Sequence, residues 1–107
     1  MSLEKKIELK DGIISFDNLT WLKDNNQVKM NVDFLTEDLL QINFFCDRFI
    51  IDVGWYPSTS KKGCFTIMLI KNQDWTKPLF ISNTRNLFDV YKYINICIKI
   101  IYKKNHL

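Results

Sequence analysis

Hydrophobic and polar residues alternate along the first half of the chain, which predicts β-strands there. Short alternating runs at 7–9 and 13–16 flank an Asp-Gly turn signal, a pattern typical of a hairpin. The clearest alternation covers residues 28–34 and predicts a half-buried strand. Another alternating run at 40–44 follows an acidic turn and is also predicted as a strand, in preference to a helix.

Two longer runs, 49–55 and 64–70, are apolar at successive positions and rich in β-branched and aromatic residues. This composition favours strands in the centre of a sheet. The connection 57–62 between them is polar and basic, so we expect it to be exposed. Residues 79–81 are long enough only for a short final strand.

A long helix is predicted at the C-terminal end, with Asn86 as its N-cap. Apolar residues recur there at helical spacing and form one face: Leu87, Val90, Tyr91, Ile94, Ile98 and Ile101. Three further apolar residues, Tyr93, Ile96 and Ile100, lie off that face. Either the helix is embedded in a groove of a curved sheet, which we favour, or this flank meets another chain.

Several strands followed by one helix predict an α+β fold. We expect a single α+β domain over residues 1–107, with a curved, half-barrel-like antiparallel sheet of about five to seven strands packed on one long C-terminal helix.

Composition and cysteine usage point to a cytoplasmic protein. The first six residues lack an apolar core, so we expect no signal peptide. The apolar segment 87–102 is interrupted by Lys92, Asn95 and Lys99, so we expect no membrane span. Three scattered cysteines without metal spacing, at positions 46, 64 and 97, are interpreted as reduced, buried thiols.

The net charge of +3 hides an asymmetry between the two halves. Residues 1–54 hold six basic and ten acidic side chains, whereas residues 55–107 hold nine basic and two acidic ones. Such an asymmetry can steer a charged partner toward one part of the surface.

The sequence shows no recognisable set of catalytic residues. The only histidine, His106, stands next to the end of the chain, and no serine or cysteine has a base that the sequence makes visible. There is no metal-ligand motif or glycine-rich phosphate loop. We therefore predict a protein that is not an enzyme and needs no cofactor.

Two kinds of binding surface remain. Basic and aromatic residues in the second half could grip single-stranded nucleic acid; these are Lys61, Lys62, Lys71, Lys77, Trp55, Tyr56 and Trp75. Acidic residues in the first half could instead imitate nucleic-acid phosphates and dock on a basic protein; these are Asp33, Glu37, Asp38, Asp47 and Asp52. Either set could also be an ordinary solvated surface.

The segment Gly54-Trp55-Tyr56-Pro57, the later Asp74-Trp75 and the single helix that follows resemble small bacterial immunity proteins of polymorphic-toxin and contact-dependent growth-inhibition systems. The resemblance covers about residues 50–103. It implies a cytoplasmic monomer that binds one cognate toxin domain 1:1, often a nuclease, and blocks it by covering or flanking the active site. Nuclease inhibitors of this family are often acidic overall, whereas here only the first half is acidic.

We therefore predict an immunity protein whose acidic first half complements a basic toxin. The predicted partner-binding residues are Asp33, Glu37, Asp38, Asp47, Asp52, Trp55 and Tyr56. We expect no direct contact with nucleic acid and no membrane association. The alternatives are a small nucleic-acid-binding module and a homodimeric accessory protein joined through the flank that carries Tyr93, Ile96 and Ile100.

Overall fold

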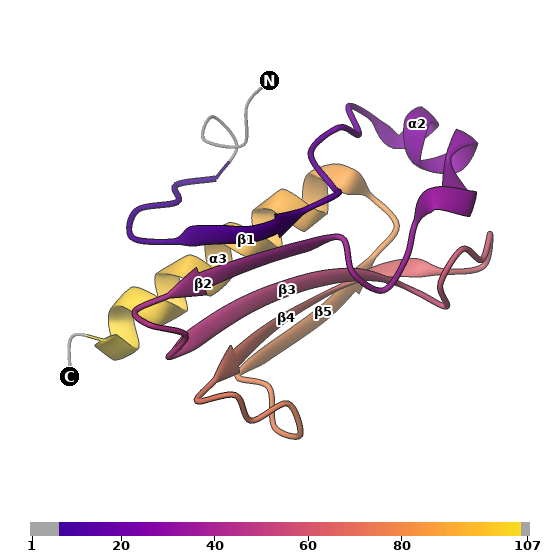
Figure 1. Ribbon diagram of the computed structural model, residues 1–107. Coiled ribbons are helices and arrows are strands. Elements are labelled where there is room, and N and C mark those ends of the chain that lie inside the picture. Colours follow the sequence, from indigo (N-terminus) through magenta and orange to yellow (C-terminus); the bar gives the residue numbers. More distant parts are fainter. Residues whose placement is uncertain (1–6, 106–107) are drawn as a thin grey trace.

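A five-stranded antiparallel sheet carries one long helix across one of its faces (Figure 1). The computed structural model describes residues 7–105. The strands follow one another in chain order as a meander: β1 (Ile13–Asp17), β2 (Leu40–Phe44), β3 (Phe49–Tyr56), β4 (Cys64–Lys71) and β5 (Phe80–Thr84). The predicted α+β class and the single C-terminal helix are confirmed, and the sheet is open rather than a closed barrel.

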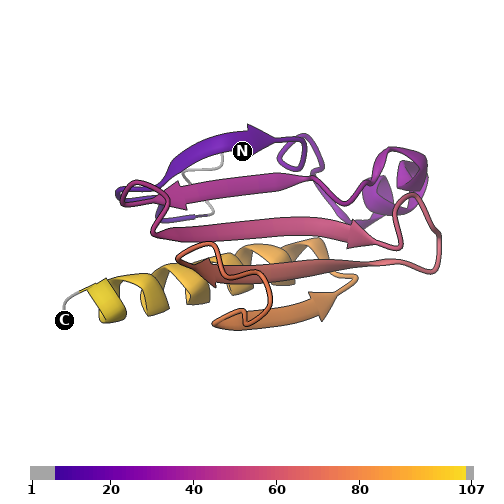
Figure 2. The same cartoon turned by 60° about the horizontal axis from the view of Figure 1, so that its bottom comes forward.

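The strand register separates the side chains onto two faces of the sheet, because successive residues of a strand point to opposite sides. One row packs toward the helix and consists of Ile42, Ile51, Leu69 and Phe80. The neighbouring row lies on the opposite face and consists of Phe16, Gln41, Asp52, Met68 and Ile81. We call this second side the outer face. In Figure 2 it comes forward, with the helix behind the sheet.

Helix α3 (Leu87–Asn105) forms where the spacing predicted it. All six residues of the predicted apolar face are buried. The Asn86 side chain accepts a hydrogen bond from the Phe88 backbone N–H at 2.9 Å, which confirms the predicted N-cap. On the other flank, the Tyr93 ring lies 6.0 Å from the Phe80 ring, and Ile100 also packs against the core. These contacts support a helix set into the curved sheet.

The strand predicted over residues 28–34 is wrong. Those residues belong to helix α2 (Asn25–Met30) and to the 3₁₀-helix η1 (Val32–Phe34). The Asp24 side chain caps α2 by accepting a hydrogen bond from the Gln27 backbone N–H at 2.9 Å. Within residues 28–34 only Val28 and Val32 are buried, four residues apart as on a helix.

The N-terminal hairpin forms only in part. Residues 13–16 lie in β1 as predicted, whereas residues 7–9 are outside any strand. The predicted turn is present, because the Gly12 backbone N–H donates to the Leu9 carbonyl at 2.8 Å. Residues 8–11 then contact α3, where the Asp11 N–H donates to the Tyr102 hydroxyl at 2.9 Å.

The three cysteines are free thiols, as predicted, but they differ in exposure. Cys97 is buried in α3, Cys64 is half-buried and Cys46 is exposed in the turn after β2. The expectation that all three are buried is therefore wrong. No helix within residues 7–105 combines the length and apolar character that a membrane crossing requires.

Candidate functional site

The outer face of the sheet has no helix over it and carries large apolar side chains in contact with solvent. Ile13, Phe16 and Ile81 are 70%, 41% and 58% exposed. The β4–β5 connection lies in front of one end of this face (Figure 2). Ile13 and Phe16 lie on edge strand β1 and Ile81 on the opposite edge strand β5, so they form two separate apolar spots rather than one patch.

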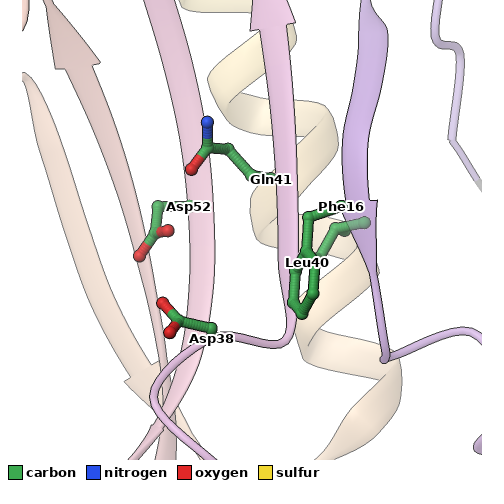
Figure 3. Close-up of a pocket in the computed structure, with 5 residues that line it drawn as sticks. All are labelled: Phe16, Asp38, Leu40, Gln41 and Asp52. Atoms are coloured by element: carbon green, nitrogen blue, oxygen red, sulfur yellow. The ribbon is translucent and has the colours of Figure 1, made fainter.

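A pocket of about 230 Å³ opens on the outer face and contains two carboxylates. Its lining consists of Phe16, Asp38, Leu40, Gln41 and Asp52 (Figure 3). Asp52 projects from β3, Gln41 from β2, and Asp38 from the segment just before β2, so that both carboxylates border the same space. We call this hollow the acidic pocket.

A register shift in β1 places Phe16 at this pocket. Ile14 pairs with Ile42 and Phe16 with Gln41, so Ser15 is an extra residue on β1. In a regular ladder Phe16 would follow Ile14 onto the helix side, because residues two apart share a face. The bulge turns Phe16 to the outer face instead.

The backbone of β3 holds Asp38 in place. The Leu39 N–H donates to the Val53 carbonyl at 3.0 Å, and the Trp55 N–H donates to the Thr36 carbonyl at 2.8 Å. Residues 37 and 38 arch over Gly54 between these two bonds. A Cβ atom on Gly54 would overlap the Glu37 carbonyl oxygen. The glycine is therefore required for the close approach of the segment that carries Asp38.

Asp52 is the most unusual group of the pocket. It is only 9% exposed, and within the described residues no hydrogen bond or ion pair reaches its carboxylate. Burial, and secondly the nearby charge of Asp38, raise the pKa of Asp52 from 3.8 to about 6. No fully buried side-chain oxygen of the described residues lacks a hydrogen-bond partner, so the Asp52 carboxylate oxygens remain in contact with the solvent of the pocket. A carboxylate that is largely buried and has a raised pKa in a surface hollow is a candidate for contact with a ligand.

The raised pKa of Asp52 has a consequence for stability. The folded protein binds this proton more tightly than the unfolded chain does, so the free energy of unfolding falls as pH rises from about 4 through about 6. Asp52→Asn removes the charge and is expected to stabilise the protein at pH 7 by about 1–2 kcal/mol, after allowance for solvent in the open pocket. Urea denaturation of both proteins between pH 4 and pH 8 measures this difference.

The matched control is Asp33→Asn, which removes an equal charge from an exposed position in η1. Its effect on the free energy of unfolding should be small. The stabilisation by Asp52→Asn should shrink toward pH 4, where the wild-type carboxyl is already protonated in the folded state. An Asp52→Asn protein that is no more stable than wild type at pH 7 would contradict the assignment.

Tyr56 and Glu37 do not line the acidic pocket but lie beside it, since both come within 2.9 Å of the position that a Cβ on Gly54 would occupy. Tyr56 is half-buried at the end of β3, and burial is the largest cause that raises the pKa of its hydroxyl. The charges of Asp52, Glu37 and Asp38 add to this shift in that order. The structure therefore brings together four of the seven predicted site residues: Glu37, Asp38, Asp52 and Tyr56.

The other three predicted residues lie elsewhere. Trp55 is 3% exposed, its ring packs edge-on to Phe65 at 4.9 Å, and its indole N–H donates to the Ser60 carbonyl at 2.8 Å. It is a core residue, so it does not belong to the surface. Asp33 is exposed in η1. Asp47 lies in the β2–β3 turn, at the other end of β2 from Asp38, where it accepts from Asn43 at 2.6 Å.

A second hollow, of about 370 Å³, is lined by Asn18, Trp21, Asn31 and Phe34. We call it the aromatic hollow; Trp21 and Phe34 are 45% and 69% exposed. It adjoins the acidic pocket, because the Asn18 N–H donates at 2.6 Å to the carbonyl of Leu39, the residue between Asp38 and Leu40. The sequence interpretation did not identify Phe16, Trp21 or Phe34 as surface residues, since alternation assigned Phe34 to a strand.

The chemistry of the combined surface suits a cation. Two carboxylates and the aromatic side chain of Phe16 line the acidic pocket, and both kinds of group attract cations. Among the described residues, no three histidine, cysteine or acidic side chains form a group that could hold a metal ion. The acidic pocket therefore favours a positively charged organic group over a negatively charged one.

The basic residues considered for nucleic-acid binding do not form one patch. Lys61 and Lys62 precede β4, whereas Lys71 ends it and Lys77 lies in the connection beyond. Trp75 is exposed on that second side, and Trp55, on the first, is buried. A continuous basic and aromatic track, which single-strand binding uses, is therefore not formed by these residues.

Comparisons with protein-family models, with curated proteins and with solved structures find no match for this chain.

Proposed function

We propose that this protein is a non-catalytic immunity protein that binds and neutralises a cognate protein toxin. The observation that carries the proposal is the carboxylate of Asp52, largely buried and beside Asp38, which is open only to a pocket on the uncovered face of the sheet. Partial burial and the like charge of Asp38 make the ionised form of Asp52 unfavourable in the free protein. A partner that supplies the opposite charge removes that cost, which favours the complex.

The contact surface consists of the acidic pocket and the aromatic hollow together. A lysine or arginine of the toxin enters between the Phe16 ring and the carboxylates of Asp38 and Asp52, while Trp21 and Phe34 supply apolar contact. Aromatic side chains and desolvated charge pairs are the groups that dominate the energy of protein interfaces. Basic residues also line the nucleic-acid clefts of nucleases, so the nuclease toxins implied by the family resemblance fit this surface.

The test first requires a candidate toxin domain, sought in the protein encoded immediately upstream of this one. Co-expression of the two proteins is expected to restore growth to cells that the toxin domain alone kills, and calorimetry on the purified pair should give a 1:1 complex. Asp38→Asn is expected to weaken binding by about 30-fold or more, because truncating one partner of a desolvated charge pair costs about 2 kcal/mol or more.

Asp47→Asn is the matched control, because it removes the same charge from the far end of β2. Its affinity for the toxin domain should lie within about twofold of wild type. Equal losses in both variants would mean that overall charge, rather than the acidic pocket, governs binding. Failure to restore growth, or saturable binding of a random oligonucleotide at low salt, would overturn the proposed function itself.

A further inference from the structure

A separate cavity of about 140 Å³ lies among α2, the β3–β4 connection and the link between β5 and α3. Asn25 and Lys29 come from α2, Lys61 from the β3–β4 connection and Arg85 from the link before α3. The remaining lining is apolar and is formed by Val28, Val32 and Trp55. Four polar side chains from three separate segments of the chain thus converge on an apolar base.

The charge around this cavity is unbalanced. Three of its lining side chains are cations, and no acidic residue contributes to the lining. Within residues 7–105, Lys29, Lys61 and Arg85 form no ion pair. The three cationic side chains are exposed, and together they give this part of the surface a positive potential. An anion is the kind of ligand that this potential favours.

Tertiary hydrogen bonds hold two of the polar groups in position. Arg85 donates from Nη2 to the Lys62 carbonyl at 3.1 Å, which uses one of its five N–H donors. Asn25 accepts at 2.8 Å from the Leu87 N–H and donates at 3.3 Å to the Asn86 side chain. Arg85 also stands just before the N-terminus of α3, where the helix dipole adds positive potential.

The size and charge of the cavity indicate the ligand class. Sites for whole drug-sized ligands have volumes of roughly 300–1,000 Å³, so this cavity holds a single chemical group. An arginine with two lysines matches the charge and the several acceptor oxygens of a phosphate better than those of a carboxylate. We infer that the cavity binds a phosphate group, either as the free ion or as the monoester of a small molecule.

Titration of the ¹⁵N-labelled full chain with sodium phosphate, at constant ionic strength and pH 7.5, tests this inference by NMR. Saturable shifts are expected for the backbone amides of residues 60–63 and 85–87 and for the Trp55 indole N–H. Arg85→Gln and Lys61→Gln should each raise the dissociation constant at least fivefold. Lys92→Gln, which removes an exposed charge from α3, should change it less than twofold.

Two further arms identify the source of the phosphate and protect the test against misfolding. A 5′-mononucleotide should bind at least as tightly as inorganic phosphate, and its nucleoside should not bind. If the NMR spectrum of Arg85→Gln shows that this variant is unfolded, the Lys61→Gln result tests the inference alone. Lys61 is exposed, so its substitution is not expected to disturb the fold. Shifts that do not saturate, equal affinity in Lys61→Gln and wild type, or equal binding of nucleoside and nucleotide would overturn the inference. None of these measurements involves the toxin.

Discussion

Trp55→Ala is expected to lower the free energy of unfolding by about 3–5 kcal/mol, the range for truncating a buried aromatic residue. The indole is 3% exposed, packs on Phe65 and donates to the Ser60 carbonyl. Alanine removes these contacts and leaves a cavity, while the Ser60 carbonyl keeps only its hydrogen bond from the Gly63 N–H at 2.9 Å. Since small domains have a total stability of about 5–15 kcal/mol, the variant should be near its unfolding midpoint in mild urea.

Trp21→Ala and Trp75→Ala are the controls, because both indoles are about half exposed. Each should change the free energy of unfolding by less than about 1 kcal/mol. The comparison also separates the two interpretations of Trp55. A Trp55→Ala protein with wild-type stability and weakened toxin binding would restore the sequence-based prediction of a surface anchor.

Gly54→Ala is expected to lower the free energy of unfolding by about 3 kcal/mol, at the upper end of the range for overpacking. The added methyl group would overlap the Glu37 carbonyl oxygen and lie 2.9 Å from both the Glu37 carbonyl carbon and a Tyr56 ring carbon. Backbone atoms of a segment that is bonded to β3 on both sides cannot move without loss of those bonds. Urea denaturation measures the loss, and toxin binding should weaken in parallel because Asp38 shifts with the segment.

The double variant Gly54→Ala/Glu37→Ala provides the control. The obstructing atom is a backbone oxygen, so trimming the Glu37 side chain should not restore stability. Restoration by the second substitution, or a loss of less than about 0.5 kcal/mol in Gly54→Ala alone, would show that the segment before β2 is free to move.

The helix and the central strands could be predicted from sequence because their signals are local and redundant. The apolar face of α3 repeats over five turns, and the cap at Asn86 marks its start. The segments that form β3 and β4 are so rich in apolar residues that they must be buried in the folded protein. Each of these patterns is compatible with only one element type over its length.

The strand prediction for residues 28–34 was wrong because the same residues also fit a helical pattern. Val28 and Val32 are a helical pair, and Leu35 continues the same face by one turn. Met30 and Phe34, which completed the apparent strand, are 82% and 69% exposed. The sequence alone cannot distinguish an apolar residue that is buried from one that faces solvent as part of a binding surface.

The amino-acid sequence determined the class of the fold, the position of its helix and the concentration of acidic residues in the first half. The tertiary structure decided which of those residues act together. Strand pairing brings Asp52 beside Asp38 and leaves Asp47 at the far end of β2, and the bulge in β1 turns Phe16 toward the pocket. Register and bulges depend on contacts between distant segments, and the pKa of Asp52 depends on burial, so neither is encoded in the local pattern.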